Sequence, residues 1–200
     1  MRRLVLVLLV AACEPALPEG WGQRDAGFVS DAGVDAGRRY VTFTPDGGGW
    51  AVTVDAMDST RWASVDLDAP AEVPFEGDGW DLAFSRFHIR ARGGASGDGG
   101  VAVTAIYDAG YAAVQQAPNG PWLQDLPDGP DENMDLDTVL DKAEVWYEYE
   151  GVFHSLTPRP IVYVVRSDRA GYFKLKIDGY YDRAGTPAFF RLRFAPVAPP

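Results

Sequence analysis

Very few side chains in this 200-residue chain could act as a thiol nucleophile or offer an imidazole or thiolate to a transition metal. They are one cysteine, Cys13, and two histidines, His88 and His154. A single cysteine excludes an internal disulfide framework and a zinc site built from cysteines, and two histidines exclude a histidine-rich metal centre. Several enzyme classes are therefore excluded before any longer motif is considered.

No motif of a common enzyme class is present either. The chain contains no Gly-x-Ser-x-Gly turn. Acylation of Cys13, which its place after the N-terminal apolar run indicates, would leave no free thiol for a Cys-His pair. The glycines of residues 93–100 are not followed by the Lys-Ser or Lys-Thr of a phosphate-binding loop. We therefore expect a binding protein rather than an enzyme.

The chain is strongly acidic, with 29 acidic against 18 basic residues and a formal net charge of −11. An acidic surface repels phosphate backbones, which argues against nucleic acid as a partner. Five aspartates crowd one segment without the Asp-x-Asp-x-Asp-Gly order of a calcium loop; they are Asp125, Asp128, Asp131, Asp135 and Asp137. We expect a solvated acidic loop there rather than a calcium site.

The N-terminus has the order of an export signal. Two arginines precede an apolar run of roughly 9 residues, which is too short to span a bilayer, since that takes about 20. Two alanines stand directly before Cys13, an arrangement that resembles the lipoprotein box of bacteria. The resemblance implies acylation of Cys13 and anchoring in a lipid membrane of the bacterial cell envelope, which we expect to be the outer membrane. An ordinary secretory signal with an incidental cysteine is the alternative.

Residues 13–38 have the composition of a flexible tether, in which Asp-Ala-Gly occurs three times. A small, acidic and glycine-rich segment cannot bury enough apolar surface to offset the entropy lost on ordering. We therefore expect a signal peptide at residues 1–12, a lipidated tether at 13–38 and one folded domain at 39–197.

From residue 39 onward, apolar and polar residues alternate with the period of half-buried strands. Phe173 and Leu175 fall on one face and Lys174 on the other, whereas residues 161–165 are continuously apolar, as in a strand covered on both faces. Only residues 135–144 could form a helix, and a short one. Segments rich in proline and glycine separate the strands at residues 69–79, 93–100, 117–131 and 157–160. The pattern predicts a single all-β domain of about ten to twelve short strands, mostly antiparallel.

Residues 80–100 combine an alternating run with a cluster of glycines. Trp80, Leu82 and Phe84 share one strand face. From Phe87 and Ile89 onward the apolar residues fall on odd-numbered instead of even-numbered positions. The glycines that follow permit a tight turn that other residues could not adopt. We expect Trp80 to be buried.

This segment resembles the motif of the HmuY family, bacterial surface lipoproteins whose founding members bind haem. The family motif is a Trp-Asp-x-Ala-x-x-Arg strand followed by a glycine- and serine-rich loop. The matching residues are Trp80, Asp81, Ala83, Arg86, Gly94, Ser96 and Gly97. Residues 53–62 and 146–182 also resemble the family, in the same order. The resemblance implies an all-β HmuY-like domain on a lipid anchor.

In family members that bind haem, two histidine or methionine side chains hold the iron. The resemblance therefore leaves as candidates His88, His154, Met57 and Met134. Met134 lies in the loop that would supply one iron ligand. His154 comes a few residues after the position at which the family's founding member has its second iron ligand. Each has a structural alternative: His154 could be a strand-edge histidine bonded to backbone, and Met134 a core side chain before a short helix. His88 lies inside the motif, where we expect a structural hydrogen bond.

A porphyrin also needs an apolar cleft and cationic partners for its propionates. The aromatic residues that could line such a cleft are Trp122, Trp146, Tyr147 and Tyr149, although most must belong to the core. Arg159 or Arg166 could contact the propionates, although surface arginines are usually just solvated.

The resulting hypothesis is a membrane-anchored lipoprotein of the HmuY type that binds haem, a related porphyrin or a haemoprotein without catalysis. The alternative keeps the scaffold and the anchor but binds a protein or glycan partner without haem. Two correctly placed axial ligands would distinguish the first hypothesis from the second, and the sequence supplies at best one.

Overall fold

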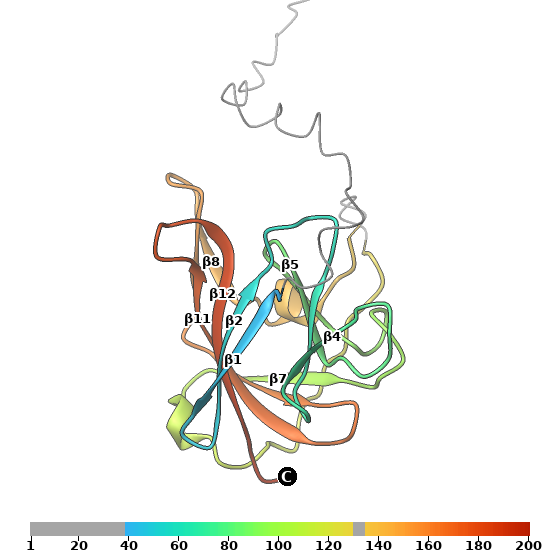
Figure 1. Cartoon of the computed structure of the whole chain (residues 1–200). Helices are drawn as coiled ribbons and strands as arrows, with labels where there is room; N and C mark the ends of the chain where they lie inside the picture. Colours follow the sequence, from blue (N-terminus) through green and yellow to red (C-terminus); the bar gives the residue numbers. More distant parts are fainter. Residues whose placement is uncertain (1–38, 130–134) are drawn as a thin grey trace, which may run out of the picture. The chain divides into compact units, whose positions relative to one another are not determined.

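A computed structural model describes residues 39–129 and 135–200 (Figure 1). Cys13, the tether and Met134 lie outside these residues, so the expectations placed on them stay predictions. Across the described ranges, no helix combines the length and the apolar character needed to cross a membrane.

Twelve strands make up much of the described chain and confirm the predicted all-β fold. They are β1 (Val41–Asp46), β2 (Gly49–Asp55), β3 (Ala63–Asp66), β4 (Ala71–Val73), β5 (Leu82–Ser85), β6 (His88–Ala91), β7 (Ala102–Ile106), β8 (Tyr147–Glu150), β9 (Ser155–Pro158), β10 (Val162–Arg166), β11 (Tyr172–Tyr181) and β12 (Pro187–Pro196). A 3₁₀ turn, η1 (Tyr111–Ala113), and a π-helical turn, η2 (Val139–Ala143), accompany them. The second turn lies inside the predicted helix at 135–144 but is only five residues long.

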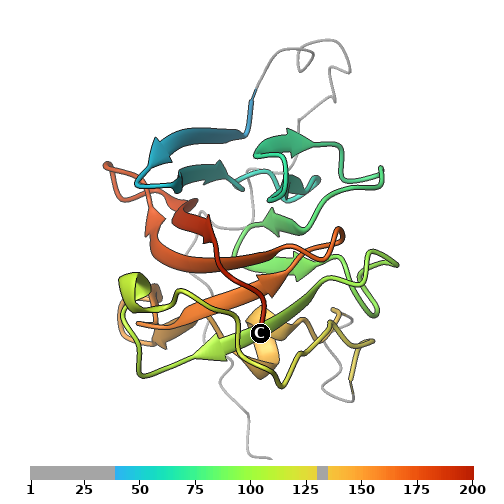
Figure 2. The same ribbon diagram turned by 90° about the horizontal axis from the view of Figure 1, so that it is seen from below.

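The strands form three antiparallel sheets. The first has the order β1-β2-β12-β11-β10-β7 and the second the order β4-β3-β5-β6, while β8 and β9 form a separate hairpin. Figure 2 shows the long, curved strands of the first sheet in orange and red. Both larger sheets contribute to one core, in which Val52 and Leu175 of the first pack with Leu82 and Phe84 of the second.

Strand β10 is covered on both faces, as its continuous apolar sequence predicts. Tyr163 belongs to the main core, while Val162 and Val164 belong to a smaller apolar cluster under the segment that follows β7. Because this cluster covers the outer face of the sheet, Lys174 on the neighbouring strand is buried as well. Its Nζ donates a hydrogen bond to the carbonyl oxygen of Val114 at 2.9 Å and lies 4.7 Å from the Tyr111 ring centre, and both contacts offset part of the cost of burying the charge.

The short strand β4 lies within residues 69–79, which the sequence predicts as a break. It pairs with β3, and the Glu72 carboxylate accepts hydrogen bonds from the backbone N–H groups of Tyr40 and Val41 at 3.0 and 3.2 Å. This partner is about thirty residues away in sequence, so local composition gives no sign of the strand.

Trp80 is buried as expected, and replacing it with alanine should lower the free energy of unfolding by about 3–5 kcal/mol. The substitution removes a ring that packs on Phe75 with centroids 5.1 Å apart, and it leaves a cavity. Urea unfolding followed by circular dichroism measures the loss, and Trp62→Ala, at a half-buried position, is a control that should cost less. A loss below ~1 kcal/mol for Trp80→Ala would contradict this packing.

Candidate functional site

The first half of the family-like motif folds into the hairpin β5–β6 instead of one alternating strand. Arg86 and Phe87 form its two-residue turn, and Arg86 has a φ of 55°, a value that such tight turns require. The Arg86 backbone N–H donates to the carbonyl oxygen of Ala56 at 2.8 Å, and its guanidinium donates to that of Met57 at 2.9 Å. The arginine therefore holds the hairpin turn against the segment that follows β2.

The glycine-rich loop after β6 packs against the backbone and side chains around it. A Cβ on Gly94, whose φ is 61°, would lie 2.1 Å from the carbonyl oxygen of Asp125. Gly97 has a φ of 150°, and a Cβ added to it would lie 3.0 Å from Cγ of Arg92. Close approach and backbone conformation both call for glycine at these positions. Between them, the Ser96 hydroxyl donates to the Asp125 carboxylate at 2.6 Å.

Asp125 is 1% exposed and accepts two further hydrogen bonds, from the backbone N–H groups of Ala91 at 2.9 Å and Val139 at 2.8 Å. Burial raises the pKa of its carboxyl, while the three hydrogen bonds lower it. The expectation of a solvated acidic loop is therefore wrong for Asp125, because donors from three segments replace water around it. Local composition does not distinguish this aspartate from its acidic neighbours.

Asp81, the second residue of the motif, is fully buried and also holds backbone groups. It accepts hydrogen bonds from the N–H groups of Leu67 at 2.7 Å and Asp168 at 2.9 Å. Burial raises the pKa of Asp81 to about 7, with smaller contributions from the negative charges of Asp168 and Asp68. This carboxyl therefore connects the segment after β3 with the turn between β10 and β11.

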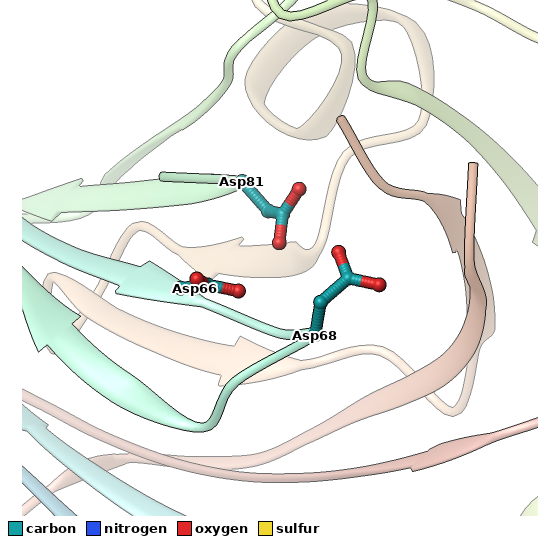
Figure 3. Close-up of side chains that lie close together, drawn as sticks. All are labelled: Asp66, Asp68 and Asp81. Atoms are coloured by element: carbon teal, nitrogen blue, oxygen red, sulfur yellow. The ribbon is translucent and has the colours of Figure 1, made fainter. Parts of the chain in front are cut away.

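Figure 3 shows Asp81 facing Asp66 and Asp68, and oxygens of the three carboxylates lie within 4.8 Å of one another. Asp66 forms an ion pair with Arg169 at 3.0 Å, so one of the three charges is already compensated. Burial raises the pKa of Asp81 to about 7, so its proton would lower the repulsion among the three carboxyls. Its contacts indicate a structural role.

The stability of the folded chain should fall as the pH rises from about 4 to about 7. The pKa of Asp81 is raised from 3.8 to about 7 on folding, so between these values the folded chain holds a proton that the unfolded chain has released. This contribution is complete below the unfolded pKa and is lost as the pH rises through the folded one. Urea unfolding at several pH values measures the slope.

Asp81→Asn should reduce that slope, whereas Glu76→Gln, which removes an exposed carboxyl, should leave it as it is. A slope unchanged in Asp81→Asn would show that another group controls the pH dependence.

His88, at the start of β6, makes the kind of structural contact that the sequence analysis expects. Its Nδ1 lies 3.1 Å from Oδ2 of Asp141, a carboxylate in η2 whose side chain is 6% exposed. Burial raises the pKa of Asp141, while the hydrogen bond from His88 lowers it. Next to His88, the Phe87 carbonyl oxygen accepts a hydrogen bond from the Trp146 indole at 3.0 Å. The β5–β6 turn is thereby joined to η2 and to the segment that leads into β8.

His154 lies in the turn of the β8–β9 hairpin, the element that stands beside β11 and β12 in Figure 1. Its φ of 52° is rare for a residue with a side chain, and the chain enters β9 directly after it. Its Nδ1 contacts the hydroxyl of Tyr149, and the two ring centroids are 6.0 Å apart. Val152 and Phe153, in the same turn, are 78% and 79% exposed.

The other residues considered for a porphyrin cleft are divided between the core and the surface. Trp146 is 1% exposed and belongs to the core, so it cannot line an open cleft, whereas Tyr149 is 58% exposed. Trp122 packs against Tyr172, and the Arg166 guanidinium lies 5.8 Å from the Trp122 ring centre. The exposed hairpin turn is therefore the part of the described chain that brings an accessible histidine next to exposed apolar side chains.

The match of a family model decides the family of this chain. The model for the HmuY protein matches residues 58–194. The chain belongs to the HmuY family. A search of curated proteins found no match.

Solved structures show the same fold at low sequence identity. A protein of Bacteroides vulgatus, provisionally described as HmuY-like and haem-binding, is 17% identical, with a TM-score of 0.57 over 74% of this chain and 91% of that one. A protein of Bacteroides fragilis, provisionally described as a lipoprotein, is 20% identical, with a TM-score of 0.52 over 74% and 90%. The apo HmuY analogue of Tannerella forsythia is 14% identical, with a TM-score of 0.55 over 77% and 95%. At these identities the likeness shows the fold alone.

Two residues contact the histidines in a way that the sequence did not indicate. Asp141 carries no local signal, because its importance arises from the distant His88. The sequence suggested Tyr149 only as an aromatic side chain that could line a cleft. Its spacing of five residues from His154 across a hairpin could have indicated that the two side chains are in contact.

Proposed function

We propose that this HmuY-family chain is a membrane-anchored lipoprotein that binds haem or a related porphyrin without catalysing a reaction. The observation that carries the proposal is the tip of the β8–β9 hairpin, where Val152 and Phe153 are exposed beside His154. Two adjacent exposed apolar side chains can contribute to a binding surface, and a neighbouring imidazole can supply an axial ligand to iron.

His154, Val152 and Phe153 could contact the iron and the apolar face of haem, whereas the exposed Glu148 and Glu150 of the same hairpin would repel its propionates. His154 is exposed, and its Nδ1 is engaged by Tyr149, so Nε2 is the nitrogen free to face a ligand. Met134, the second proposed ligand, lies outside the described residues. Bound haem would supply a redox-active iron and a large apolar face, and the part of the protein is to hold and orient it. Solved structures of the same fold support the proposal, since one is provisionally described as haem-binding and another as an HmuY analogue.

The anchor is the second part of the proposal. Cys13 would carry the acyl chains, and residues 13–38 would connect them to the domain, which places the protein at the cell envelope, most simply at the outer membrane. The structure of a similar protein provisionally described as a lipoprotein supports this location. In this setting the partner is free haem, a related porphyrin or a haemoprotein.

The same turn also favours a second candidate function, the binding of a protein or glycan partner without haem. Glu148 and Glu150 are exposed on β8, next to the exposed Val152 and Phe153. Apolar side chains in the turn and acidic side chains on β8 are suited to contact a partner surface that has an apolar centre surrounded by basic residues. The scaffold and anchor are the same in both candidates.

Haemin titration of the purified full chain should distinguish the two. We expect a saturable Soret shift with the spectrum of His/Met or single-histidine ligation, not of two histidines, because His88 is held by Asp141. His154→Ala and Met134→Ala should each weaken affinity about ten- to hundred-fold or move the Soret band. His88→Ala is the control and should mainly lower stability. Absence of any shift at micromolar haemin would reject haem binding, and a shift untouched by both substitutions would reject this ligand pair.

The N-terminus of the mature protein gives an independent test. Mass spectrometry of protein extracted from bacterial membranes should show a chain that begins at Cys13 and carries two or three acyl groups. Cys13→Ser should release the domain from the membrane fraction, whereas Ser30→Ala should not. An unmodified Cys13 would contradict the lipid anchor.

A further inference from the structure

We propose that Tyr149 is a positioning residue that holds the His154 ring so that Nε2 faces the ligand. This inference rests on the proposed binding of haem at the same hairpin. Tyr149 pairs with Leu156 across the hairpin, and His154 lies in the turn between them. The Tyr149 hydroxyl then contacts Nδ1, and the two rings lie at 45° to each other.

The contact determines which nitrogen of His154 can reach iron. An imidazole has two ring nitrogens, and a hydrogen bond at one of them leaves the other free to coordinate a metal. With Nδ1 facing the tyrosine, the free nitrogen is Nε2. If Nε2 held iron, a neutral imidazole would carry its proton on Nδ1, so Nδ1–H would donate and the Tyr149 oxygen would accept. Such a partner fixes the orientation of the ring and makes the imidazole a better electron donor.

The backbone at His154 gives the contact a second role. A φ of 52° is unfavourable for a residue with a side chain, and it persists only where the surrounding structure holds it. The four residue pairs of the β8–β9 ladder close the turn, and the contact with Tyr149 holds the His154 ring on the β8 side. Without it, the exposed ring could rotate freely about its side-chain bonds, and the ligand would have to order it on binding.

The two histidines of the chain differ in the group that contacts Nδ1 of each imidazole. His88 faces a buried carboxylate, Asp141, whereas His154 faces a neutral phenol in an exposed hairpin. A charged acceptor forms the stronger hydrogen bond and suits a fixed structural contact. A neutral acceptor leaves the imidazole of His154 with moderate donor strength, which suits a ligand that is bound and released.

The test compares Tyr149→Phe with Tyr147→Phe, which removes the other hydroxyl from the same face of β8. Both substitutions keep the aromatic ring, so the fold should be retained. In the haem-free full chain labelled with ¹⁵N-histidine, the Nδ1 resonance of His154 should move in Tyr149→Phe and stay in place in Tyr147→Phe. The chain contains two histidines, so the His154→Ala variant assigns the signals.

With haemin added, Tyr149→Phe should bind about tenfold more weakly than the wild type, and the iron midpoint potential should rise. A weaker imidazole donor stabilises ferric iron less, whereas a purely structural loss would lower affinity without changing the potential. Tyr147→Phe should match the wild type in both measurements.

The outcomes separate this inference from the function on which it rests. If the wild type binds no haemin, the proposed function fails, and the NMR comparison still tests the contact. If the wild type binds haemin but Tyr149→Phe has the same affinity and potential, the positioning role is overturned while haem binding stands. An unmoved Nδ1 resonance in Tyr149→Phe would overturn the inference in either case.

Discussion

The carboxylate of Asp125 joins three segments of the chain that are distant in sequence. It accepts hydrogen bonds from Ala91 at the end of β6, from Ser96 in the glycine-rich loop and from Val139 at the first residue of η2. The backbone donors of Ala91 and Val139 would be buried without a partner if the carboxylate were absent, at a cost of about 1–3 kcal/mol per group. This one side chain therefore fixes the start of η2 against β6 and the glycine-rich loop.

The same constraint extends to the base of the β8–β9 hairpin. From η2, Asp141 holds His88, and the neighbouring Phe87 carbonyl holds the indole of Trp146, the residue directly before β8. Trp146 also packs against Phe190 of β12 with ring centroids 5.1 Å apart. The hairpin therefore starts from a buried, hydrogen-bonded base, while its turn remains exposed. A buried base with an exposed turn can present a side chain such as that of His154 without disturbing the core.

Much of the fold could be predicted from the sequence, because alternation and apolar runs report burial directly. The continuous apolar run of β10 indicated cover on both faces, and the motif around Trp80 indicated the family. The sequence could not show β4, whose position depends on Glu72 binding the backbone before β1, or the burial of Asp125. These features depend on contacts between segments that are distant in sequence, and the type of a residue does not indicate which distant residue it contacts. For the candidate site, His154 could be named from the sequence, but its contact with Tyr149 required the geometry of the turn.

The central claim is that the exposed turn of the hairpin contacts the porphyrin while the buried aspartates only hold the scaffold. Paramagnetic broadening of backbone amide signals by bound ferric haem tests it most directly, because the effect falls steeply with distance from iron. We predict that the amides of Val152, Phe153 and His154 broaden first, while those of Asp81 and Asp125 stay sharp. Broadening centred on Asp81 or Asp125, with the hairpin turn unaffected, would contradict the account.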